Sequence, residues 1–79
     1  MSIDLLKKVF TESLGLTHEA DWDNLAYRGI EEWDSVAHMQ LVGEIEDAFD
    51  VMLETQEVIA MSSFTEAVRI LRQHGADVD

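Results

Sequence analysis

The sequence predicts an all-α fold: a small four-helix bundle of three main helices and one short helix, with a long loop between the first and second helices. Three observations support this prediction. Apolar residues recur at helical spacing in several stretches of the chain. No stretch has the pattern of a strand, and the chain has no proline, so its helices must end at glycines and polar clusters.

The first helix is expected over residues 3–14. Ser2 is the expected N-cap and Gly15 the expected end, because glycine readily adopts the left-handed conformation that closes a helix. The apolar residues at helical spacing are Leu6, Val9, Phe10 and Leu14.

Residues 16–34 have no sustained period and mix polar residues with apolar ones such as Trp22, Leu25 and Trp33. We expect a long loop, with at most one short helical turn, pinned by its apolar side chains. Loops of this length are uncommon in compact domains unless they are functional.

A second helix is expected over residues 35–50, with Asp34 as its N-cap. The residues expected to face inward are Leu41, Ile45, Ala48, Phe49 and Met52. The residues expected to face outward are Val36, Gln40, Gly43, Glu44 and Asp47. The outer face is therefore apolar at its start and acidic further along.

Residues 54–61 predict a short third helix, and its expected apolar contacts are Val58, Ile59 and Met61. Met39, Met52 and Met61 are expected to fill the core, because the thioether side chain adapts to irregular gaps.

Ser63 and Glu66 have the spacing of a capping box, in which hydroxyl and carboxylate each satisfy a backbone N–H. They predict a fourth helix over residues 64–74, ended by Gly75, with residues 76–79 expected to fray. Its expected inner face holds Phe64, Ala67, Val68 and Leu71.

The charge separates the classes of partner. The chain of 79 residues has 17 Asp+Glu against 5 Lys+Arg, a formal net charge of −12. No Lys or Arg lies between Arg28 and Arg69. Nucleic acid and anionic membrane would meet a repulsive surface, whereas a basic patch on another protein would be attracted.

Composition bounds the class of protein. Residues 1–79 are expected to form a single domain, and 47% hydrophobic residues suffice for a packed core. The chain has no cysteine, which excludes disulfides and thiol catalysis by its own side chains. No apolar run approaches the length that crosses a bilayer, and the N-terminus lacks the features of a signal peptide. We therefore expect a cytoplasmic protein without membrane insertion.

Ser35 lies where the loop becomes a helix, so it is either a second capping residue beside Asp34 or an exposed hydroxyl. Catalysis by Ser35, His38 and Asp34 is not expected. The cap position keeps Asp34 from the far side of the imidazole, and the G-x-S-x-G turn of many serine hydrolases is missing.

No metal site is expected either. A calcium loop counted from Asp21 to Glu32 has Leu25 and Ala26 where an oxygen ligand and a glycine are required. The three histidines, His18, His38 and His74, are too scattered along the chain for a transition-metal site.

The stretch from Glu32 to Val36, opening an acidic amphipathic helix, resembles the acyl carrier protein family. The likeness covers nearly the whole chain, including the first helix, the long loop and the Ser63–Phe64 start of the last helix. Further matching positions are Leu41, Val42, Ile45, Glu46, Phe49, Leu53, Ala67 and Val68.

The resemblance implies a carrier without enzymatic activity of its own. Ser35, preceded by the motif residue Asp34, would hold 4′-phosphopantetheine, installed from coenzyme A by a phosphopantetheinyl transferase with Mg²⁺. The arm's thiol would hold acyl groups as thioesters for acyl-loading, condensing or acyl-transferring enzymes of fatty-acid, polyketide or related biosynthesis. The carrier would act as a monomer and dock on basic patches of these enzymes through Val36, Met39, Gln40, Glu44, Glu46 and Asp47.

Three positions depart from the family pattern. Val36 replaces the usual leucine, and Glu54 stands where many fatty-acid carriers have proline. A tryptophan at position 33, before the Asp34–Ser35 pair, resembles free-standing carriers of specialised or polyketide-type pathways more than the housekeeping fatty-acid carrier. Two alternatives stay open: an aminoacyl or peptidyl carrier with the same Ser35 modification, and an unmodified acidic helical adaptor that binds a basic protein surface.

Overall fold

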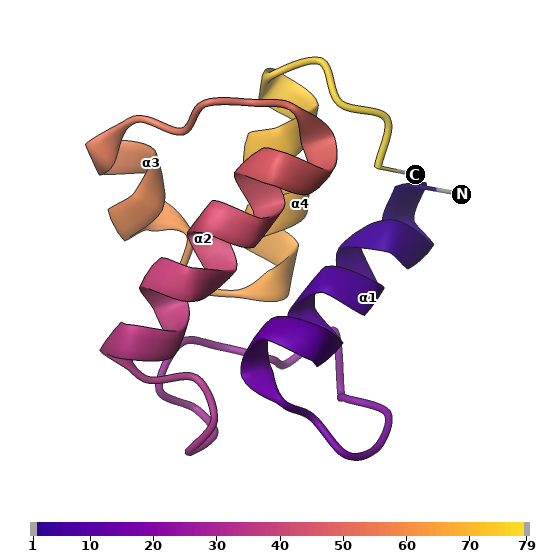
Figure 1. Ribbon diagram of the computed structural model, residues 1–79, viewed down its shortest axis with the longest axis vertical. Coiled ribbons are helices and arrows are strands. Elements are labelled where there is room, and N and C mark those ends of the chain that lie inside the picture. Colours follow the sequence, from indigo (N-terminus) through magenta and orange to yellow (C-terminus); the bar gives the residue numbers. More distant parts are fainter. Residues whose placement is uncertain (1, 79) are drawn as a thin grey trace.

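A computed structural model describes residues 2–78, with Ser2 described by its backbone alone, and confirms the all-α fold. Within these residues the helices are α1 (Ser2–Leu14), α2 (Ser35–Phe49), α3 (Thr55–Ala60) and α4 (Phe64–Gln73). In Figure 1, α1 and α3 lie to the two sides of α2, and α4 is seen behind it. The same residues contain no strand, although one isolated antiparallel bridge pairs Ala26 with Ser63.

Helix α1 forms as predicted, and its apolar stripe is buried at Leu6, Val9, Phe10 and Leu14. It ends at Gly15, whose φ of 67° lies in the left-handed region. The predicted capping role of the Ser2 side chain lies outside the described residues.

The segment 15–34 contains no helix, as predicted, and runs beneath α1 and α2 in the view of Figure 1. Leu25 and Trp33 are buried and pin it to the core. Two backbone bonds join it to residues 62–64, where α4 begins: the Tyr27 N–H donates to the Ser62 carbonyl at 2.8 Å, and the Phe64 N–H to the Leu25 carbonyl at 3.1 Å. The loop is therefore fixed at its middle as well as at its ends.

Helix α2 begins as predicted, with Asp34 as its N-cap. The predicted inner face is correct for Leu41 and Ile45 but wrong for Ala48, which is exposed, and for Met52, which is 83% exposed. The buried face is instead made of His38, Leu41, Val42 and Ile45. Met52 departs because Asp50 ends the helix at a left-handed φ of 53°, so the helical phase does not extend beyond it.

Helix α3 contributes no buried residue, and Ile59 is 75% exposed. Met61, directly after it, is completely buried and anchors the turn toward α4. Met61 therefore fills the core as predicted, whereas the same prediction is wrong for Met39 (61% exposed) and Met52.

Helix α4 begins with half of the predicted capping box. The Ser63 hydroxyl accepts a hydrogen bond from the Glu66 N–H at 3.0 Å, while the Glu66 carboxylate pairs with Arg69 at 2.7 Å. The inner face also includes Ile70, which the predicted stripe omitted, and Val68 is only half-buried.

The segment after α4 returns to the core. Gly75 takes a φ of 85° and reverses the chain, the Ala76 N–H donates to the Leu71 carbonyl at 3.0 Å, and Val78 is 1% exposed. The prediction that residues 76–79 fray is therefore wrong for 76–78, because the turn brings Val78 back to an apolar site. Asp79 lies outside the described residues.

Candidate functional site

Ser35 is the first residue of α2, and its side chain is exposed. The capping role belongs to its neighbour: Asp34 Oδ1 accepts the Ala37 N–H at 2.9 Å, and the Asp34 carbonyl accepts the His38 N–H at 2.8 Å. The structure thus decides between the two predicted roles of Ser35 in favour of an exposed hydroxyl.

The position of Ser35 suits a negatively charged substituent. The first-turn N–H groups of a helix have no carbonyl partners within the helix, and the helix dipole is positive at this end. An anion bonded to the Ser35 oxygen would lie near this positive end, a favourable place for phosphate.

A groove of about 340 Å³ opens beside Ser35, between α2 and α3. Its lining is mostly apolar and comes from three parts of the chain. The loop contributes Tyr27, and α2 contributes Ser35, His38 and Met39. Helix α3 contributes Val58 and Ile59, and Met61 follows directly after it. The hydroxyl therefore stands at the edge of an apolar surface that two helices build together.

Three large apolar side chains are exposed on α2 and α3: Met39 and Ile59 line the groove, and Val36 directly follows Ser35 in the chain. Val36 is 68% exposed, Met39 61% and Ile59 75%. We call Val36, Met39 and Ile59 the apolar rim. Side chains of this size exposed together near one hydroxyl are typical of a surface that contacts another molecule.

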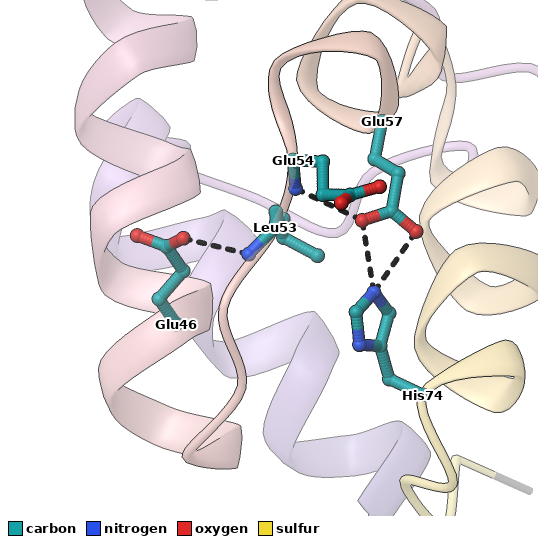
Figure 2. Close-up of polar contacts among 5 residues, drawn as sticks. All are labelled: Glu46, Leu53, Glu54, Glu57 and His74. Carbon is teal, nitrogen blue, oxygen red and sulfur yellow. Dashed lines mark hydrogen bonds and ion pairs between the residues drawn. The ribbon is translucent and has the colours of Figure 1, made fainter.

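The rest of the outer face of α2 is polar and acidic. Gln40, Glu44 and Asp47 are exposed, as predicted. Glu46, also predicted to contact partners, is half-buried, and its Oε2 accepts the Leu53 N–H at 2.9 Å, as Figure 2 shows. Glu46 therefore supports the linker after α2.

His38 is buried and cannot serve Ser35 as a base. The Trp33 indole N–H donates to His38 Nδ1 at 2.9 Å, and His38 Nε2 lies 2.9 Å from the Val58 carbonyl. Both ring nitrogens are thus occupied by partners other than Ser35, which excludes the serine–histidine pair of a hydrolase at this site. The contact between Trp33 and His38 was not predicted from the sequence.

Among residues 3–78, no three histidine or acidic side chains gather closely enough to hold a metal ion. No helix in the same part of the chain is long and apolar enough to cross a membrane.

Comparisons of the chain with protein-family models, curated proteins and solved structures find no match.

Proposed function

We propose that the chain is a carrier protein that bears 4′-phosphopantetheine on Ser35 and presents acyl groups to partner enzymes. The observation that carries this proposal is the exposed Ser35 hydroxyl at the start of α2, at the edge of an apolar groove, with Asp34 as the cap. The likeness of residues 32–36 to the acyl carrier family supplies the identity of the group.

The residues present fit the group. In the modification, the Ser35 oxygen would bond to the phosphorus of coenzyme A that carries the pantetheine. The diphosphate bond would break and release adenosine 3′,5′-bisphosphate, and the hydroxyl proton would pass to a base of the transferase. The product phosphodiester would lie at the positive end of α2. The bound group would supply the thiol that the cysteine-free chain lacks.

Partners would dock on the face that carries Ser35. The apolar rim would enter a complementary apolar pocket, and Gln40, Glu44 and Asp47 would face basic side chains. Charge complementarity of this kind speeds association and leaves affinity modest. A carrier needs modest affinity because it must leave one enzyme before visiting the next. We propose that it does so in the cytoplasm as a monomer.

Catalysis would belong to the partners. His38, three residues after Ser35, has both ring nitrogens occupied by Trp33 and Val58, so it would not serve as a base for acyl transfer. An aminoacyl or peptidyl carrier would share every step at Ser35. The acidic outer face of α2 favours acyl groups over aminoacyl or peptidyl groups as the cargo.

The test is incubation of the purified protein with coenzyme A, Mg²⁺ and a promiscuous phosphopantetheinyl transferase, followed by intact mass measurement. We expect an increase by one phosphopantetheine in the wild type and in Ser62→Ala, which removes another exposed serine. Ser35→Ala should show no increase. No increase in the wild type with several transferases would favour the acidic adaptor.

A further inference from the structure

His38 lies at the junction of three segments. His38 lies in the first turn of α2 and is 9% exposed, and its ring lies between the indole of Trp33 in the loop and the Val58 carbonyl in α3. The Trp33 and His38 rings stack at 25° with centroids 5.9 Å apart, and the centroid of the Tyr27 ring lies 5.1 Å from that of His38.

The donors around the ring define its tautomer. An indole N–H only donates, so His38 Nδ1 must be the acceptor of the bond from Trp33. A carbonyl oxygen only accepts, so His38 Nε2 must carry the proton that it donates to Val58. His38 is therefore held as the neutral Nε2–H tautomer, between the donating Trp33 indole at Nδ1 and the accepting Val58 carbonyl at Nε2.

Helix α3 depends on such contacts. It has six residues and none of them is buried, and a helix this short is not stable by its own hydrogen bonds. The bond from His38 holds α3 at the Val58 carbonyl, and Val58 directly precedes Ile59 of the apolar rim. The donor of this bond, His38, lies in α2 one helical turn after Ser35.

We infer that His38 is a positioning residue that holds α3 against the first turn of α2 and so assembles the two-helix docking surface beside Ser35. This inference rests on the proposed function, since it concerns how partners engage the same site. The partner it implies has an apolar pocket wide enough to contact Met39 on α2 and Ile59 on α3 at once. A partner that contacted α2 alone would not sense His38.

Two substitutions separate the two bonds. His38→Gln places an amide N–H near the Nε2 position and can keep the bond to Val58. His38→Asn places an amide oxygen near the Nδ1 position and can keep only the bond to Trp33. His18→Asn is the matched control, because His18 is exposed and its ring hydrogen-bonds the adjacent Thr17 hydroxyl at 3.1 Å.

The measurement is the steady-state kinetics of Ser35 modification by the transferase, at a temperature where every variant is folded by circular dichroism. We expect His38→Asn to raise KM for the carrier at least about threefold with kcat unchanged, the signature of lost docking energy. His38→Gln should stay closer to the wild type, and His18→Asn should equal it. Equal KM values for His38→Asn and His18→Asn would overturn the inference.

Two readouts on the same proteins keep the test independent of the proposed function. ¹⁵N spectra of the wild-type His38 imidazole should show a protonated Nε2 and an unprotonated Nδ1, and the opposite tautomer would refute the bond from His38 to Val58. Amide exchange in residues 55–61 should be faster in His38→Asn than in His18→Asn. If the wild type is never modified but the tautomer and the amide exchange are as expected, the proposed function is wrong. The inference that His38 holds α3 against α2 is then still supported.

Discussion

His74 Nε2 lies 2.9 Å from both carboxylate oxygens of Glu57 (Figure 2). This contact joins the end of α4 to α3, between residues 17 positions apart in the sequence. The same carboxylate accepts the Glu54 N–H at 2.9 Å and so caps the start of α3. Glu57 therefore secures the first turn of α3 through contacts separate from the His38 bond to Val58.

The first prediction concerns acid stability. The Glu54 amide and then the His74 ring hold the pKa of the Glu57 carboxyl below its ordinary value of 4.5. A lowered carboxyl pKa stabilises the folded state fully above pH 4.5, and this stabilisation is lost as the pH falls through the folded value. In urea titrations, Glu57→Gln should therefore destabilise the protein near neutral pH and lose this deficit below pH 4.5.

Glu44→Gln is the control for this prediction, because Glu44 is an exposed glutamate of α2. It removes the same charge from the acidic surface, so the difference between the two variants isolates the contacts of Glu57. Parallel stability curves for Glu57→Gln and Glu44→Gln across this range would contradict the prediction.

The second prediction concerns Trp33, which is completely buried and donates to His38. Trp33→Phe keeps an aromatic ring near Phe10, 5.4 Å away in the wild type, but leaves a buried nitrogen without its donor. We expect a loss of about 1–3 kcal/mol in the free energy of unfolding, with a further loss from the smaller ring.

Trp22→Phe provides the comparison, because Trp22 is half-buried and its N–H bonds an exposed glutamate, Glu19. Its loss should be clearly smaller in the same denaturant titration. Equal losses for the two tryptophans would show that the buried bond adds nothing beyond packing.

The third prediction separates Asp34 from Ser35. Asp34→Ala removes the N-cap of α2 and should lower the free energy of unfolding by about 1 kcal/mol, whereas Asp34→Asn keeps an acceptor and should cost less. Ser35→Ala should change stability by less than about 0.5 kcal/mol, because Ser35 is exposed and Asp34 is the cap. A larger loss for Ser35→Ala than for Asp34→Ala would mean that the serine caps the helix.

The fourth prediction follows from the charge of −12. Repulsion among the carboxylates opposes folding, and salt screens it. The melting temperature should therefore rise with added NaCl, and rise more at equal ionic strength with MgCl₂, because divalent ions associate more strongly with clustered carboxylates. A flat response in differential scanning calorimetry would show that the carboxylates are too dispersed to repel one another appreciably.

The sequence predicted the features that local chemistry decides. A carboxylate before the amphipathic stretch predicted Asp34 as the cap, and glycines at the ends of apolar stripes predicted the ends of α1 and α4. The exposure of Ser35 follows from its place at the start of α2. The apolar residues that define the buried face of this helix, beginning with Leu41, come later in the sequence.

Contacts between distant segments were not predictable in this way. His38 is part of the core because Trp33 and the Val58 carbonyl meet it from two other segments, and neither partner is within a helical turn of it. Val78 is buried because the turn at Gly75 reverses the chain, while Met52 is exposed because Asp50 ends α2 early. The apolar character of a residue alone does not distinguish these two outcomes.

The central claim is that the Ser35 hydroxyl carries the prosthetic group, and locating the added mass tests it most directly. Cleavage after Arg28 and Arg69 releases residues 29–69, a peptide that also holds Thr55, Ser62, Ser63 and Thr65. Fragmentation of this peptide from transferase-treated protein should place one phosphopantetheine on Ser35. An unmodified peptide, or the same mass on any of the other four hydroxyls, would contradict the account.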